Sequence, residues 1–312
     1  MTPRLLLFPV FAALLAVAGC KRDSVKDITE IGKIEKPAAQ QPVEPPVTPV
    51  AYRVVQLNDS VRNAMLRTYD STALRTVLAL NRIDKRFLSR MDSIVVPDTL
   101  LDDFNAYAPF PRRLHAADSV RKLLLCSYPS QAVAAYENGS LVRWGPASFG
   151  KKSTPTPTGY FHTNWKAKRT VSTDNPEWIL DWYFNLTNFR GVSLHEYELP
   201  GFPASHACVR LREDDARWIY HWADQWRLTP DGRSVAAYGT PVVIYGEYDF
   251  GAPRPWFALP ENPNAISIDE NALTEIVKPH VSTMLQRQAQ RDSVLAAQDV
   301  PVVMSENTKP AG

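Results

Sequence analysis

The feature that most constrains the fold is a series of short apolar stretches between turn signals, which occupies residues 119–250. Segments such as L-L-L-C-S-Y, A-V-A-A-Y, L-V-R-W and P-V-V-I-Y have the length and composition of single β-strands. The E-N-G-S tetrapeptide that follows A-V-A-A-Y predicts a tight hairpin turn. By contrast, E-D-D-A-R-W-I-Y-H-W-A-D-Q-W has the spacing of an amphipathic helix, with acids in its first turn. About 130 residues of this kind predict one mainly β domain.

The N-terminus has the pattern of a secretory signal. Arg4 is followed by the apolar run L-L-L-F-P-V-F-A-A-L-L-A-V-A and then by Gly19-Cys20. The run is short for a bilayer span, and small residues stand at the expected cleavage site, so we expect residues 1–19 to be removed. An uncleaved transmembrane anchor is the alternative. The ending V-A-G-C resembles a bacterial lipobox, which implies lipidation of Cys20 and a membrane-anchored lipoprotein in the cell envelope that faces the periplasm.

Three further segments surround the β-rich domain. Residues 20–50 are polar and proline-rich, and they predict an extended linker. Residues 51–98 have a strand, helix, helix, strand pattern, with the first helix expected after an Asp cap, and they predict a small α/β module. This module resembles a degenerate LysM unit in its L-N-R-I-D and V-V-P-D elements, although a small helical cap is an equal alternative. Residues 251–312 predict an extension that is partly helical, at residues 269–298, and partly disordered.

Charge and cysteine usage narrow the class of function. The net charge of +2 is small and no basic run stands out, so we expect no nucleic-acid partner. Of the three cysteines, Cys126 lies in an apolar stretch that predicts a buried strand, where a free thiol acts as a small hydrophobe. Cys208 lies among small and polar residues. Although an oxidising envelope would permit a disulfide between them, these different environments favour two separate thiols.

Cys208 stands close to two of the six histidines, in a segment that contains L-H-E-Y-E-L-P-G-F-P-A-S-H-A-C-V-R-L. A purely structural cluster is one explanation, but Pro200, Gly201 and Pro203 place the group on a loop. A zinc site formed by His195, His206 and Cys208 is a second, although His-x-Cys is not a common chelating spacing. The third is a nucleophilic thiol whose proton is accepted by a histidine across the loop. We adopt the third.

Three motifs in this region carry a family resemblance. S-H-A-C-V-R-L closely resembles the S-H-G-C-[VI]-R-[ML] signature of L,D-transpeptidases of the YkuD type, T-P-T-G-Y-F resembles their T-P-x-G-x-F element, and L-H-E-Y-E-L-P-G-F-P-A resembles their upstream histidine loop. The resemblance covers about 130 residues and implies a β-sandwich catalytic domain. It also implies acyl transfer between peptidoglycan stem peptides, without a metal or organic cofactor.

Carried over by motif position, the resemblance assigns roles to individual residues. Cys208 becomes the nucleophile and His195 the general base, and His206 lies beside the thiolate and shapes the pocket. The substrate-binding positions are Ser205, Ala207, Arg210, Gly159 and Tyr160. Arg210 either holds a stem-peptide carboxylate or pairs with Asp214.

Two positions depart from the family pattern. Ala207 replaces the usual glycine, and a positive φ there costs on the order of 1 kcal/mol for alanine. Glu196 follows the upstream histidine, where Gly or Ser is common, and its carboxylate is expected to raise the pKa of His195. The main-chain carbonyl at this position is expected to orient the imidazole.

The remaining expectations concern the groove and the acceptor. The aromatic residues before His195 are expected to be mostly core, with a minority lining the groove: Trp178, Trp182, Tyr183 and Phe184. The acceptor of the acyl group can be a stem-peptide amine, a protein lysine or water, and these share one nucleophile and one base. A lipoprotein that binds peptidoglycan without turnover is the alternative from another class. The sequence predicts no oligomeric state.

Overall fold

The computed structural model describes residues 50–188 and 191–298. The signal segment, Cys20 and most of the proline-rich linker lie outside these residues, so the predictions made for them are not tested by the structure. Contacts along the chain group the described residues into one compact unit. Within the described residues, no helix is long and apolar enough to cross a membrane.

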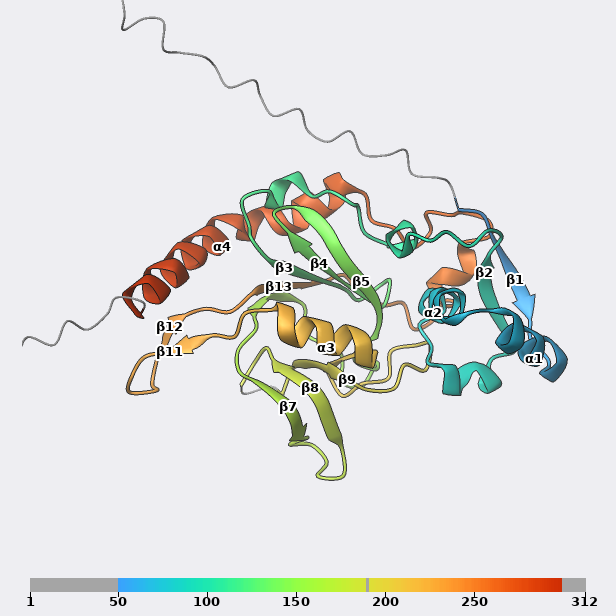
Figure 1. The fold of residues 1–312 in the computed structure, drawn as a ribbon, viewed down its shortest axis with the longest axis horizontal. Coiled ribbons are helices and arrows are strands. Elements are labelled where there is room, and N and C mark those ends of the chain that lie inside the picture. The colour runs from blue at the N-terminus through green and yellow to red at the C-terminus, as the bar shows by residue number, and fades with distance from the viewer. Residues whose placement is uncertain (1–49, 189–190, 299–312) are drawn as a thin grey trace, which may run out of the picture. The chain divides into compact units, whose positions relative to one another are not determined.

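The centre of the described unit is a nine-stranded sheet with the strand order β6-β13-β3-β4-β5-β10-β9-β8-β7. This confirms the mainly β prediction (Figure 1). Most neighbours are antiparallel, but β13 pairs with β3 and β10 pairs with β9 in parallel. The strands are β3 (Leu123–Ser127), β4 (Ala132–Glu137), β5 (Ser140–Ser148), β6 (Gly159–His162), β7 (Lys166–Val171), β8 (Ile179–Asn185), β9 (Ser193–Glu196), β10 (Val209–Leu211) and β13 (Pro241–Tyr245).

The central strands are buried on both faces, which explains their nearly continuous apolar sequences. In β3, Leu124 and Cys126 contribute to a core that also includes strands β8, β9 and β10. Leu123 and Leu125 point the other way, into a second core. Successive side chains of a strand alternate between faces, so a single five-residue strand serves two cores.

The predicted hairpin joins β4 to β5. Asn138 and Gly139 both have positive φ, 46° and 73°, as a two-residue hairpin turn of this type requires. A Cβ atom at Gly139 would lie 2.7 Å from the carbonyl oxygen of Leu114, so the turn also needs glycine for space. The prediction from E-N-G-S is confirmed.

Residues 52–97 contain the predicted strand, helix, helix, strand order, in the elements β1 (Tyr52–Gln56), α1 (Asp59–Thr68), α2 (Ser71–Leu80) and β2 (Ser93–Pro97). Strands β1 and β2 pair antiparallel, and a short 3-10 helix, Lys85–Arg90, precedes β2. The cap of α1 is Asn58 rather than the expected Asp, because the Asn58 side chain accepts the Val61 N–H. Whether this module is LysM-like or a helical cap stays open.

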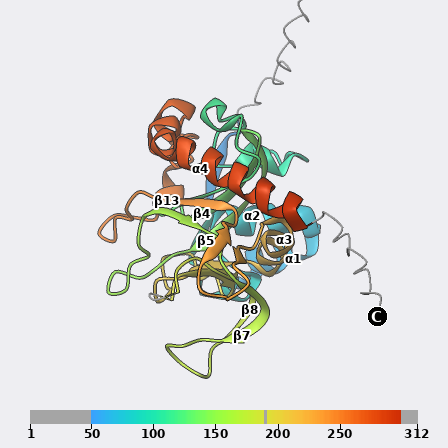
Figure 2. The same cartoon turned by 90° about the vertical axis from the view of Figure 1, so that its left-hand side faces the viewer.

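Two further helices flank the sheet, α3 (Glu213–Trp222) and α4 (Glu270–Gln298). Helix α3 carries three acids in its first turn, which confirms the prediction from the sequence. Helix α4 runs beside β3, β4 and β13 (Figures 1 and 2). Its apolar residues Leu273, Val277 and Met284 belong to the second core, so this part of the extension is more than a polar helix.

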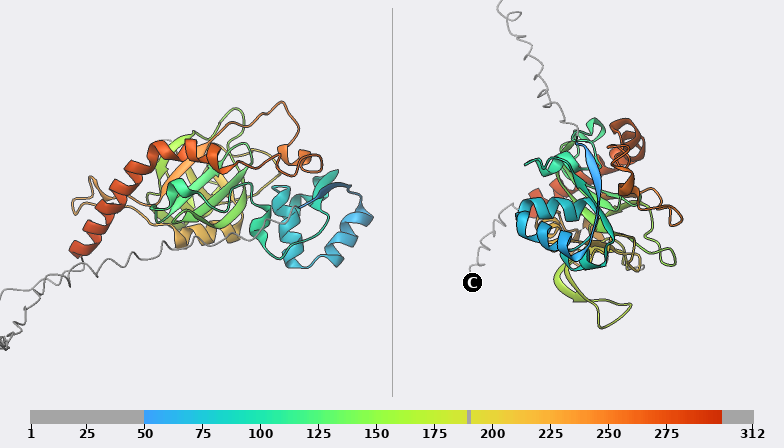
Figure 3. Two further views of the ribbon diagram at one scale, coloured as in Figure 1. Left: turned by 90° about the horizontal axis from the view of Figure 1, so that it is seen from above. Right: turned by 90° about the vertical axis from the view of Figure 1, so that its right-hand side faces the viewer.

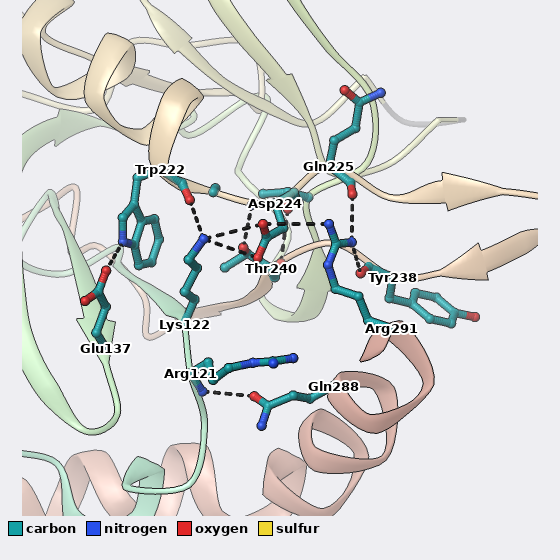
Figure 4. Close-up of polar contacts among 12 residues, drawn as sticks. Arg121, Lys122, Glu137, Trp222, Asp224, Gln225, Tyr238, Thr240, Gln288 and Arg291 are labelled. Carbon is teal, nitrogen blue, oxygen red and sulfur yellow. Dashed lines mark hydrogen bonds and ion pairs between the residues drawn. The ribbon is translucent and has the colours of Figure 1, made fainter. Parts of the chain in front are cut away.

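Polar contacts fix the C-terminal half of α4 (Figure 4). Arg291 donates to the carbonyl oxygens of Gln225 and Tyr238, at 2.9 and 3.0 Å. The Gln288 side chain accepts the N–H of Arg121 at 2.9 Å. The helix therefore attaches to loops at the end of the sheet as well as to its face.

The second core also includes residues of the N-terminal module, namely Ala79, Leu80 and Val95. The module lies beside the sheet (Figure 3), and its Ile83 makes an isolated β-bridge to Pro200 in the loop between β9 and β10. Residues 50–298 thus share hydrophobic cores across the expected domain boundaries. The boundaries themselves remain a prediction.

Candidate active site

The pairing of β9 with β10 brings the candidate nucleophile and base to one face of the sheet. In this parallel pair Arg210 lies opposite His195 and Val209 lies opposite Leu194. Cys208 immediately precedes β10 and comes next to Ser193, the residue two before His195. Because alternate residues share a face, Ser193, His195, Cys208 and Arg210 project on the same side.

The loop before Cys208 is held by main-chain hydrogen bonds. Ser205 donates its N–H to the Phe149 carbonyl and accepts the Lys151 N–H, both at 3.0 Å. Its buried hydroxyl donates to the Cys208 carbonyl. Thr156, from the T-P-T-G-Y-F motif, accepts the Gly150 N–H at 2.8 Å and lies 3.5 Å from the same Cys208 carbonyl. Ser205 is therefore a support of the nucleophile loop.

The thiol of Cys208 has two polar neighbours. It lies 3.0 Å from the Gly191 carbonyl oxygen, to which it donates, and 3.2 Å from the Ser193 hydroxyl. Burial raises the pKa of the Cys208 thiol above its usual value, and hydrogen bonds from Ser193 offset part of that rise. Cys208 and Cys126 are both free, which agrees with the prediction of two separate thiols.

His195 has the geometry of an oriented base. Its Nδ1 lies 2.8 Å from the Glu196 carbonyl oxygen. A carbonyl can only accept, so Nδ1 carries the hydrogen and Nε2 keeps its lone pair. The expectation that a main-chain carbonyl orients the imidazole is confirmed.

The prediction that the Glu196 carboxylate raises the pKa of His195 is wrong. Burial lowers the pKa of His195 to about 4; the hydrogen bond to the Glu196 carbonyl opposes this, and Arg210 adds a smaller lowering. The side chain is only 4% exposed. Glu196 acts on the imidazole through its main-chain carbonyl, and its carboxylate makes no resolved contribution to the pKa. The imidazole is therefore neutral at physiological pH.

His206 lies in the same pocket but in a different setting. Its ring stacks on Trp178, with centroids 4.8 Å apart and planes 20° apart. Its Nε2 lies 2.7 Å from the Lys151 ammonium nitrogen. Trp178 thus belongs to the minority of aromatic residues expected to line the groove, whereas Tyr183 and Phe184 are core.

Ala207 has a φ of 79°, in the region that favours glycine. The expected cost of alanine depended on a positive φ at this position, and the φ is positive. Ala207 is therefore strained, immediately before Cys208.

Arg210 does not pair with Asp214. Asp214 forms ion pairs with Arg75, Arg143 and Arg212 instead. The Arg210 guanidinium lies 4.5 Å from the centroid of the Tyr197 ring, and among the described residues it has no carboxylate partner. Its Nη1 donates to the Glu198 carbonyl oxygen at 3.5 Å.

The structure brings five of the predicted residues to one pocket: Cys208, His195, His206, Ser205 and Arg210. Three other predicted residues, Ala207, Gly159 and Tyr160, are not among the pocket-lining residues. Tyr160 packs against α4, where its ring stacks on His280 at 4.8 Å. The segment between β7 and β8 supplies another wall, through Ser172, Asp174 and Trp178.

Sequence reasoning did not single out Ser193 or Lys151. Ser193 stands two residues before His195 in β9 and so shares its face, but the sequence pattern predicted a loop and no strand there. Lys151 lies 55 residues before His206, and no local pattern joins them.

A larger cavity lies elsewhere in the described part of the chain. It has a volume of about 540 Å³ and is lined by residues of α2, by Glu196 and by Arg212 to Asp214. It contains no thiol or histidine, and it shares Tyr197 with the thiol pocket. The thiol of Cys208 and the two histidines line the smaller pocket, which is therefore the candidate site. Among the described residues, no group of three or more His, Cys, Asp or Glu is arranged to hold a metal ion.

Comparison with known proteins identifies the class of domain. Residues 121–244 match the family model YkuD, the L,D-transpeptidase catalytic domain. L,D-transpeptidase 1 of Mycobacterium tuberculosis is 31% identical over 112 residues, which are 31% of this chain. The chain spans 44% of the length of that relative. The segment 121–244 thus matches the YkuD family of L,D-transpeptidase catalytic domains, which confirms the resemblance.

Solved structures of the same class were also found. The structure of L,D-transpeptidase 1 from Mycobacterium tuberculosis is 26% identical, with 40% of this chain and 62% of that chain covered and a TM-score of 0.30. An L,D-transpeptidase from Mycobacterium smegmatis is 25% identical, with 40% and 59% covered and a TM-score of 0.32. Scores of this size do not by themselves establish a common fold.

Proposed function

We propose that this protein is a peptidoglycan L,D-transpeptidase that uses Cys208 as its nucleophile and His195 as its general base. One observation carries the proposal. The paired strands β9 and β10 put a thiol and an imidazole on one face, and the Glu196 carbonyl leaves Nε2 of that imidazole free to take a proton.

The first half of the reaction is acylation of the thiol. His195 accepts the proton of Cys208 as sulfur attacks the carbonyl carbon of the third residue of a tetrapeptide stem. The main-chain N–H groups of Ala207 and Cys208 stabilise the oxyanion. The intermediate then collapses, the C–N bond to the fourth residue breaks, and His195 protonates the departing amine. A thioester on Cys208 remains.

The second half returns the enzyme to its starting state. An acceptor amine attacks the thioester, His195 takes a proton from it, and the thiol leaves and is reprotonated. The raised pKa of Cys208 and the lowered pKa of His195 favour a neutral thiol and a neutral imidazole at rest. Proton transfer therefore accompanies the attack and does not precede it.

Arg210 is proposed to bind a carboxylate of the stem peptide. It projects from the same face as Cys208 and has no carboxylate partner among the described residues. A guanidinium can make a bidentate contact with a carboxylate, which would fix the donor stem relative to the thiol.

The proposed location follows from the N-terminal sequence. The lipobox-like V-A-G-C implies lipidation of Cys20, and residues 20–50 would then tether the folded unit to a membrane of the cell envelope, facing the periplasm. Cys20→Ser is expected to block processing at this site. A variant that still matured normally and carried lipid would contradict the anchoring.

Incubation of the purified protein with a disaccharide-tetrapeptide, followed by mass spectrometry, tests the function. A dimer that has lost one terminal residue is expected for transfer to a stem amine, and a tripeptide is expected for L,D-carboxypeptidase activity. Neither product should appear with Cys208→Ala. If the wild-type protein gave neither product but still bound peptidoglycan, the non-catalytic alternative would replace the enzyme.

A further inference from the structure

Lys151 is held beside the nucleophile loop by two contacts. Its main-chain N–H donates to the Ser205 carbonyl at 3.0 Å, and its side-chain nitrogen lies 2.7 Å from Nε2 of His206. Within residues 50–188 and 191–298, its ammonium forms no ion pair with an acid. The partner of this half-buried charge is therefore the imidazole.

The chemistry of the two groups fixes the direction of this hydrogen bond. An ammonium has three donors and no acceptor, so Nε2 of His206 must accept. The single hydrogen of the neutral imidazole is then on Nδ1. This nitrogen is buried and has no partner in the described structure, so no competing contact sets the tautomer, and the stacking on Trp178 fixes the plane of the ring.

The two histidines that line the pocket therefore differ in whether Nε2 can accept a proton. In His195 the Nδ1–H is bound to the Glu196 carbonyl and Nε2 is free. In His206 the Nε2 lone pair is already used by Lys151. Only the first of these rings has a basic nitrogen that is ready to accept a proton.

We propose that Lys151 is a positioning residue that occupies the basic nitrogen of His206, so that His195 alone accepts the thiol proton. The part that concerns proton transfer rests on the proposed function. The part that concerns the tautomer does not, and the two parts are measured separately.

The tautomer is measured from the ring 15N shifts of His206, in full-length protein labelled at histidine. The wild type should show hydrogen on Nδ1 and none on Nε2. Lys151→Met should move the hydrogen toward Nε2, Lys151→Arg should preserve the wild-type pattern because it retains a donor, and Lys152→Met is the control at the exposed neighbouring lysine. A wild-type hydrogen on Nε2, or a pattern unchanged by Lys151→Met, would overturn the proposal.

Single-turnover acylation measures the consequence. Lys151→Met should slow thioester formation by about tenfold, the loss that one charge-assisted hydrogen bond supports. Lys151→Arg should recover most of the rate, and Lys152→Met should match the wild type. Equal rates for Lys151→Met and Lys152→Met would overturn the positioning role. If the wild type formed no thioester, the proposed function would fail, and the 15N shifts would still decide the role of Lys151.

Discussion

Ala207 departs from the S-H-G-C signature that this segment resembles, and the departure has a physical cost. Its φ of 79° lies where an L-residue with a Cβ is disfavoured. The strain falls next to the nucleophile, on the N–H groups proposed for the oxyanion. It persists because Ser205 and its partners fix the loop on both sides of the bend.

Ala207→Gly should stabilise the fold. The relief of strain outweighs the greater entropy of glycine in the unfolded chain, so we expect a gain of about 0.5–1 kcal/mol and a rise in thermal midpoint of about 1–4 °C. Ala204→Gly is the matched control, because Ala204 has ordinary backbone geometry and glycine there should lower the midpoint. A lower midpoint for Ala207→Gly would contradict the strain argument.

Cys208 should react with alkylating reagents much faster than Cys126, which is 0% exposed. Since burial raises the Cys208 pKa and only the thiolate reacts, the rate should keep rising with pH through the neutral range and beyond pH 8. Peptide mapping after brief, substoichiometric alkylation at several pH values measures this. A rate that levels off near neutral pH would indicate a resting ion pair, and equal labelling of the two cysteines would contradict the nucleophile assignment.

At the scale of elements, the N-terminal module holds the segment that connects the base to the nucleophile. Asp84 donates its N–H to the Leu199 carbonyl at 2.9 Å, and its carboxylate accepts the Leu199 N–H at 2.8 Å. The adjacent Ile83 bridges to Pro200. Leu199 follows the Glu196 carbonyl that orients His195, so the module supports the base indirectly.

Asp84→Ala should destabilise the protein by about 1–3 kcal/mol, because it leaves the buried Leu199 N–H without an acceptor. Amide hydrogen exchange at Leu199 should accelerate, and Asp84→Asn should restore much of its protection because an amide oxygen can still accept. Arg53→Ala is the control, since its ion pair with Asp98 is exposed and lies in the same module. Unchanged exchange at Leu199 in Asp84→Ala would show that the contact does not hold this segment.

Most elements could be predicted from the sequence because their signals are local. Apolar runs gave the strands, Asn138-Gly139 gave the hairpin, and the acids of α3 marked its first turn. The registers and contacts between the elements could not be predicted in the same way. Neither the register of β9 with β10 nor the contact of Lys151 with His206 has a local signature, and both depend on residues that are distant in the chain.

The pKa of His195 shows the same limit. Glu196 is adjacent in sequence, and its carboxylate was expected to raise the pKa. The fold buries the imidazole and turns only the main-chain carbonyl toward it, so desolvation dominates and the pKa falls to about 4. Consecutive residues of a strand project from opposite faces, so the side chain that follows His195 in the sequence does not lie beside it in the fold.

At the scale of the whole molecule, the catalytic segment is not self-contained. One face of its central strands packs against residues on both sides of it in the sequence, including Leu80 and Val95 before it and Trp256 and Leu273 after it. The buried Arg82 adds a polar link, since its guanidinium donates to the Ser130 carbonyl at 2.9 Å. The module, the sheet and α4 therefore share one core.

Residues 50–298 should consequently unfold in one cooperative transition, whereas residues 119–250 alone should not fold. Without its partners the outer face of β3, β4 and β13 would expose a continuous apolar surface. Circular dichroism and thermal denaturation of the two segments compare them directly. A folded and cooperative segment 119–250 would contradict the shared core.

The central claim is that Cys208 and His195 act as one unit in acyl transfer. Single-turnover thioester formation from a tetrapeptide donor, followed by intact mass, tests it most directly, after circular dichroism and thermal midpoints have shown that each variant is folded. The wild type should gain the mass of the acyl group on Cys208. Cys208→Ala and His195→Ala should both lose acylation, the double variant should be no worse than either, and His206→Ala should be milder. A rate largely retained by His195→Ala and lost in His206→Ala would contradict the account and exchange the roles of the two histidines.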